Sequence, residues 1–160
     1  KVRIYCGSGD AGLTALIKGT VHSDIIDAAG GENVADVEQS ARGGVSDISM
    51  EQLMLWQPDV ILFTPGSIYS DVDMREEWQG LEAVKDKKVY EVPANPYSWI
   101  GQPPSVNRII GIKWLGNLIY PDVFQYDMKE ETKEFYKLFY HCEVTDEQVD
   151  QLLANSTKKQ

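Results

Sequence analysis

A chain of 160 residues suits one domain with a substantial core and leaves little room for a second. Its 15 Lys and Arg against 25 Asp and Glu give a formal net charge of −10, and such a surface repels phosphates, which argues against nucleic acid as a partner. No apolar run approaches the roughly 20 residues that cross a bilayer. Two cysteines, Cys6 and Cys142, form neither a CxxC pair nor a Cys/His cluster; they could be a disulfide or two buried thiols, and we expect two buried thiols.

Short apolar runs alternate with helix-like segments in the first 92 residues. The runs that favour β-strands are residues 2–6, 33–37, 60–63 and 89–92. Helical spacing predicts a helix over 21–29, and the capping-box spacing of Ser49 and Gln52 predicts another that ends near residue 57, with a further turn or two over 74–78. The run 60–63 is continuously apolar, as in a parallel strand that is buried on both faces. This alternation predicts an α/β fold.

The loop from Gly7 to Gly12 matches the GxGxxG fingerprint of dinucleotide-binding proteins and follows a predicted strand. A dinucleotide site also needs a helix that begins inside the glycines. The segment 13–18 is too short for that helix, and the better helix begins near Val21, with His22 in its first turn. We expect His22 to be a packed or solvated side chain. A small nucleotide-binding enzyme that uses the Gly7 loop is therefore the second hypothesis.

Residues 93–116 join a loop rich in Pro, Asn, Tyr and Trp to an apolar helix predicted over 106–118. Aromatic rings offer rigid apolar area, and the free N–H groups of a helix N-terminus attract negative charge, so this stretch favours ligand binding. Trp99 and Tyr97 could instead only anchor the loop, and Ser105 could only cap the helix. Arg108 lies in the first helical turn, where a cation is disfavoured, and this conflict favours an anionic partner.

Two more helices complete the chain. Capping-box spacings at Asp127 and Thr145 predict helices over 128–140 and 146–153, and the polar tail 155–160 is expected to fray. In an open parallel sheet, the loops at the carboxyl ends of the strands gather along one edge, so we expect the loops of Gly7, Ser67 and Trp99 to be neighbours. The chain has no Ser/His/Asp set with a nucleophile elbow, no HExxH and no Walker sequence. We expect a protein that binds without catalysis.

Four stretches of this chain resemble the carboxy-terminal lobe of the helical-backbone (class III) substrate-binding proteins of ABC transporters, which serve iron-siderophores, haem, cobalamin and related complexes. They are GLTALIKGTVHSDIIDAAGGENVAD (12–36), ISMEQLMLWQPDVILF (48–63), AVKDKKVYEVP (83–93) and WIGQPPSVNRIIGIKWLGNLIYPDVF (99–124). Their order and spacing together carry the resemblance, which covers nearly the whole chain.

The resemblance implies a three-layer α/β/α Rossmann-like lobe with a mainly parallel sheet over residues 1–154, followed by the polar tail 155–160. In the family, two such lobes are joined by a long helix, the ligand lies between them, and acidic side chains dock both lobes onto the permease. It further implies an extracytoplasmic protein, in the periplasm or as a cell-surface lipoprotein. The chain begins directly on a strand-like run without an initiator Met, and we expect a mature fragment whose amino-terminal lobe is missing.

By position in the family, Trp99 is expected to face the ligand, followed by Tyr97, Arg108, Tyr69 and Ser67. Aromatic rings suit the apolar face of a siderophore or corrinoid, and arginine suits a ferric siderophore's negative charge or an oxyanion. A molybdate-like oxyanion is the alternative cargo to a chelated metal.

The carboxylates expected to dock the permease are Glu76 and Glu77. No cofactor or resident metal is expected. A third hypothesis is assembly, in which the face left by the missing lobe pairs two copies.

Overall fold

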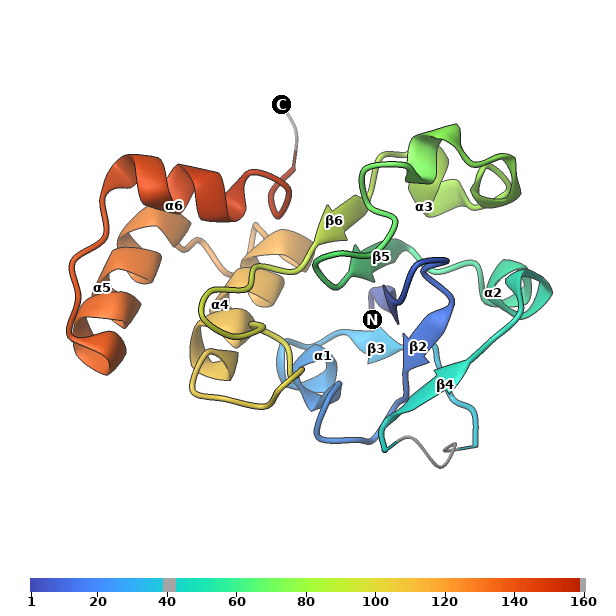
Figure 1. Ribbon diagram of the computed structural model, residues 1–160, viewed down its shortest axis with the longest axis horizontal. Coiled ribbons are helices and arrows are strands. Elements are labelled where there is room, and N and C mark those ends of the chain that lie inside the picture. The colour runs from blue at the N-terminus through green and yellow to red at the C-terminus, as the bar shows by residue number, and fades with distance from the viewer. Residues whose placement is uncertain (39–42, 159–160) are drawn as a thin grey trace.

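The computed structural model describes residues 1–38 and 43–158. Strands and helices share the first 92 residues as predicted, although two pairs of strands follow one another with no helix between them in the described residues (Figure 1). In chain order they are β1 (Arg3–Ser8), β2 (Thr14–Leu16), α1 (Asp24–Ala28), β3 (Glu32–Asn33), β4 (Val45–Asp47), α2 (Met50–Trp56), β5 (Val60–Phe63), the 3₁₀ helices η1 (Val72–Met74) and η2 (Glu76–Trp78), α3 (Glu82–Lys85), β6 (Val89–Glu91), α4 (Arg108–Ile119), α5 (Met128–Tyr140) and α6 (Asp146–Leu153). Within the described ranges, no helix combines the length and the apolar character needed to cross a membrane.

The sheet runs in the order β4-β2-β1-β5-β6, and β3 pairs with the first residues of β1. β1 is parallel to β3 and β5, and β5 is parallel to β6. β2 is antiparallel to both β1 and β4. Three of these five pairings are parallel, so the prediction of a mainly parallel sheet is confirmed.

The sheet lies between two layers of helices because its central strands are apolar on both faces. In β1, Ile4 and Cys6 belong to one core cluster, whereas Tyr5 between them belongs to the other. The first cluster is covered by α1 and α4, with α5 and α6 packed beyond α4, and the second by α2 and α3 (Figure 1). The predicted three-layer α/β/α lobe is therefore confirmed.

The predicted helix starts agree with the structure where a side chain caps them. Ser49 Oγ accepts a hydrogen bond from Gln52 N at the start of α2, and Asp127 accepts from the first turn of α5. Thr145 and Gln148 form a complete capping box at α6. These bonds satisfy N–H groups that the helix itself cannot pair, so each start is fixed locally.

Other segments differ from the sequence-based expectation. The segment after the Gly7 loop is the short antiparallel strand β2, and the polar stretch 38–47 contains β4. The predicted helix 21–29 begins later, at Asp24, and the predicted strand 33–37 shrinks to Glu32–Asn33. Strands this short owe their conformation to their partners in the sheet, which a local pattern does not report.

The tail 155–160 does not fray where the structure describes it. Ser156 is buried, its Oγ donates to the carbonyl oxygen of Glu91 at 2.6 Å, and its own carbonyl accepts from Trp114 Nε1 at 2.7 Å. Asn155 O accepts a hydrogen bond from Glu91 N at 2.9 Å. The tail thus covers the outer edge of β6 and pins α4 to it.

Candidate functional site

Three parallel strands, β1, β5 and β6, end side by side, and we call the loops that follow them the carboxyl edge: residues 9–12, 64–70 and 93–107. The backbone N–H of Thr64 donates to Gly7 O at 3.0 Å, which aligns the ends of β1 and β5. Ser67 Oγ donates to Gly9 O at 2.7 Å and ties the first two loops together. The expected proximity of the Gly7 and Ser67 loops is therefore confirmed, and the third loop starts beside them at the end of β6.

The glycine loop is a tight turn between two antiparallel strands. Gly12 has φ +70°, and a Cβ on Gly7 would lie 2.3 Å from Gly12 O, so both positions require glycine. Tyr5 Oη donates to the same carbonyl at 2.8 Å. The chain then enters β2 and not a helix, so no helix N-terminus faces a pyrophosphate here. The nucleotide-binding alternative is therefore wrong, because the glycines serve a hairpin.

Asn107 organises the third loop from the residue before α4. Its side chain is fully buried, and its Nδ2 donates to Tyr97 O at 2.7 Å and to Asn95 O at 3.2 Å. Its Oδ1 accepts from Tyr140 Oη at 2.5 Å, and Tyr136 Oη donates to Asn95 O. The loop is thereby bound to both α4 and α5, so the edge is held in shape before any ligand arrives.

His22 ties the same loop to the segment before α1. Its Nδ1 lies 2.6 Å from Gly101 O, and because the carbonyl can only accept, Nδ1 carries the proton. A Cβ on Gly101 would meet His22 backbone atoms at 2.9 Å, and one on Gly44 would meet its ring at 2.3 Å. His22 is thus packed, as expected, but at the junction of three segments. No local sequence pattern signals this contact, since Gly101 lies 79 residues away.

Trp99 does not face solvent, and the prediction that its ring faces the ligand is wrong. The residue is 0% exposed and packs edge-on against Trp114 of α4, with ring centroids 6.4 Å apart. Gly111 lets the helix approach the loop so closely that a Cβ there would lie 1.8 Å from Trp99 O. The ring therefore anchors the loop to the core, which was the alternative that the sequence left open. Tyr97, two residues earlier, is 47% exposed and stays available.

Arg108 is the first residue of α4 and donates through its guanidinium to the carboxylate of Asp24, the first residue of α1. α1 precedes β3, which is parallel to β1, so both helices start on the carboxyl-edge side of the sheet. Asp24 offsets the cost of a cation at a helix N-terminus. The Nε of Arg108 is buried and has no hydrogen-bond partner within the described residues. Because Nε is buried, a donor to a ligand that arrives from solvent has to come from the other guanidinium N–H groups.

The remaining predicted residues lie in the loop after β5. Ser67 is half-buried, and Tyr69 packs partly against the second core cluster. Glu76 and Glu77 are exposed in η2, where Glu77 Oε1 lies 4.0 Å from Arg75 Nη1. Arg42, which the sequence would allow either to reach an anionic ligand or to be an ordinary surface residue, lies outside the described residues.

The carboxyl edge, with Arg108 beside it at the start of α4, can therefore offer hydroxyls, backbone N–H groups, the exposed ring of Tyr97 and one arginine. Among residues 1–38 and 43–158, no group of His, Cys, Asp and Glu is placed to hold a metal ion. Cys6 is buried as expected, and burial raises the pKa of its thiol to about 12. Cys142 is exposed, so the expectation of two buried thiols is wrong for the second. These groups suit hydrogen bonding to a ligand that brings its own charge.

Comparison with known proteins also finds ligand-binding relatives. The family model described as periplasmic binding protein matches residues 1–96. The molybdate-binding protein MolA of Haemophilus influenzae is 31% identical over 145 residues, a match that covers 88% of this chain and 39% of the relative.

Two solved structures share the fold closely. An ABC transporter solute-binding protein from Sulfurospirillum deleyianum superposes with a TM-score of 0.89 at 33% identity, over 96% of this chain and 48% of that one. MolA bound to molybdate superposes with a TM-score of 0.73 at 28% identity, over 90% and 43%. The chain thus spans less than half the length of the relatives it matches.

Proposed function

This chain belongs to the periplasmic binding protein family, and we propose that it forms the carboxy-terminal lobe of the substrate-binding component of an ABC importer. The observation that carries the proposal is the carboxyl edge, where loops from three parallel strands converge and are held by Ser67, Asn107 and His22. Ligands of open parallel sheets bind at this edge. The lobe binds and delivers its cargo without chemical conversion.

The cargo that the edge suits best is a small oxyanion of the molybdate type. Burial of Trp99 removes the ring expected to lie against a flat chelate, whereas the hydroxyls and Arg108 remain. Oxyanions are held by such donors. The likeness to MolA supports the same class, since that relative is a molybdate-binding protein. A ferric siderophore, haem or corrinoid is the second candidate, and exposed Tyr97 favours it.

The edge is one wall of a cleft, and a second lobe supplies the other. The expected source of that lobe is an amino-terminal half of the same polypeptide. This agrees with the share of its relatives that the chain spans, 48% of one solved relative and 39% of MolA. Glu76 and Glu77, exposed on η2, are the carboxylates proposed to meet the membrane permease. The protein would then work outside the cytoplasm, in the periplasm or as a lipoprotein at the cell surface.

Calorimetric titration of the intact two-lobed protein with a panel of ligands tests the function. The panel contains molybdate, tungstate and sulfate on one side, and a ferric hydroxamate, haem and cobalamin on the other. Binding of molybdate or tungstate without a response to the chelates supports the oxyanion class. Binding of a chelate alone would transfer the proposal to the second class. Absence of heat with every member of the panel at millimolar ligand contradicts the binding function itself.

A further inference from the structure

A cavity of about 320 Å³ lies between the beginning of the third loop, α5 and α6. Asn95 lines it from the loop, and Thr132 and Tyr136 line it from α5. Its volume falls at the lower end of the range of small-molecule sites, roughly 300–1,000 Å³. Neither Tyr97 nor Arg108 lines it, so the cavity is distinct from the surface proposed for the cargo.

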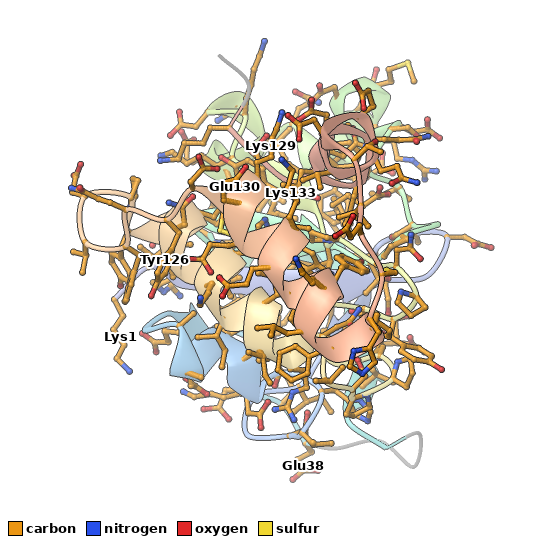
Figure 2. The ribbon with its side chains drawn as sticks, turned by 90° about the vertical axis from the view of Figure 1, so that its left-hand side faces the viewer. Lys1, Glu38, Tyr126, Lys129, Glu130 and Lys133 are labelled. Carbon is orange, nitrogen blue, oxygen red and sulfur yellow. The ribbon has the colours of Figure 1, made fainter. Side chains whose placement is uncertain are left out.

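The lining of this cavity is uncharged, although the two helices beside it are rich in charge. Nine of the 21 residues of α5 and α6 are Asp, Glu or Lys, yet the six that line the cavity are all neutral. The charges pair on exposed sides of the helices instead, Lys129 with Asp150 at 2.7 Å and Lys133 with Glu130 at 3.1 Å (Figure 2). A charged ligand would lose hydration in the cavity without gaining a counter-ion, so the lining favours a neutral ligand.

The polar groups of the lining can both accept and donate hydrogen bonds. The buried Thr132 hydroxyl donates within its own helix at 2.6 Å, and the Tyr136 hydroxyl donates to Asn95 O, so the lone pairs of both oxygens remain to accept. Gln148 Oε1 accepts from Thr145 N at 2.8 Å, so its amide nitrogen remains to donate. A ligand hydroxyl group matches such a wall because it also does both.

Tyr136 joins the polar and apolar parts of the wall. Burial raises the pKa of its hydroxyl, and the nearby indole N–H of Trp99 opposes that rise. Yet this N–H is buried and completes no hydrogen bond among the described residues, whereas buried indole N–H groups usually have a partner. The hydrogen bonding around Tyr136 is therefore unsaturated. The ring itself, with Val144 and Leu152, gives the cavity an apolar surface beside these polar groups.

We propose that this cavity binds a neutral polyhydroxylated ring, either a monosaccharide or a cyclic polyol. Hydroxyl groups of such a ring donate to Thr132 and Tyr136 and accept from Gln148. Its C–H groups pack on Val144 and Leu152. The site does not depend on which cargo the carboxyl edge receives, because the cavity has walls of its own.

Saturation-transfer NMR on the intact two-lobed protein tests the proposal, with glucose and myo-inositol as neutral probes and gluconate and glucosamine as charged ones. The neutral probes should bind in the millimolar range, and the charged ones at least fivefold more weakly. Ala94→Trp adds a ring at an exposed position of the lining and should abolish the signal. The matched control is Ala154→Trp, exposed at the end of α6 and outside the lining. Thr132→Val keeps the shape, removes one acceptor and should weaken binding about fivefold.

Absence of transfer to both neutral probes at millimolar concentration overturns the proposal, because the cavity then holds only water. Equal binding of neutral and charged probes also overturns it, as does binding that survives both Ala94→Trp and Thr132→Val. Circular dichroism checks that each variant folds. The result is separate from the test of function. A protein that binds molybdate but neither sugar nor polyol keeps the proposed function and loses this site, whereas one that binds only the neutral probes, through Ala94 and Thr132, does the reverse.

Discussion

Gly111 offers the sharpest test of how the carboxyl edge is held, because α4 touches the third loop there. Replacing it with alanine places a Cβ 1.8 Å from Trp99 O, where ordinary contact begins at 3.4 Å. Helix and loop would have to separate by about 1.6 Å, and overpacking of this kind costs about 1–3 kcal/mol or more. Alanine gains about 1 kcal/mol over glycine in a helix. Because a separation of this size places the overpacking cost at the upper end of that range, about 3 kcal/mol, we expect Gly111→Ala to lose about 2 kcal/mol net.

Gly116 in the same helix is the matched control. There the new Cβ meets the ring of Phe124 at 3.1 Å, and a side chain can move by the few tenths of an ångström required. The propensity gain is the same, so Gly116→Ala should be neutral or slightly stabilising. Urea unfolding followed by circular dichroism should show free energies of unfolding that differ by about 2–3 kcal/mol between the two variants, with a similar dependence on urea concentration. Equal stability of the two would refute the close approach of α4 to the Trp99 loop.

Two ionisable contacts give predictions with opposite pH dependence. Burial raises the pKa of Tyr136 from 10.0 to about 12, so the stability tied to its protonated hydroxyl is present below pH 10 and lost as pH rises towards 12. Tyr136→Phe, which loses the bond to Asn95 O, should cost about 1 kcal/mol at neutral pH and flatten this alkaline loss, as measured by urea midpoints. Lys133 lowers the pKa of Asp146 by donating a hydrogen bond to its carboxylate. The stability that this pair contributes is therefore present above the ordinary pKa of the carboxyl group and is lost as pH falls through the lowered pKa. Lys133→Met should flatten the acid limb, and an unchanged limb would contradict the pairing.

Segments whose structure is determined locally were predictable from sequence. The continuous apolar run Val60–Phe63 forms the interior strand β5 with the predicted bounds. Side chains at Ser49, Asp127 and Thr145 cap helices at the predicted starts. In each case the determining interactions lie within one turn or one strand, which a sequence window contains.

The site depended on contacts that no window contains. Arg108 was found by its conflict with the helix dipole, but its partner Asp24 lies 84 residues away. Trp99 was expected to face the ligand because of its position in the family, in a loop rich in proline and asparagine. Its burial depends on Gly111 and Trp114 of the next helix, where a missing side chain admits the loop. Loop composition therefore indicated an edge of the sheet, whereas position in the family selected a side chain that the structure buries.

The central claim is that the carboxyl edge receives an anionic ligand through Arg108. It is tested most directly by titrating molybdate into Arg108→Gln and Arg75→Gln, which remove an arginine from α4 and from the loop before η2. Each arginine pairs with a carboxylate in the unmodified chain, so the two substitutions remove the same charge and the same kind of ion pair. The account predicts that Arg108→Gln weakens binding at least tenfold, as loss of a charged hydrogen bond does, while Arg75→Gln leaves it unchanged. Equal affinities in the two variants would contradict it.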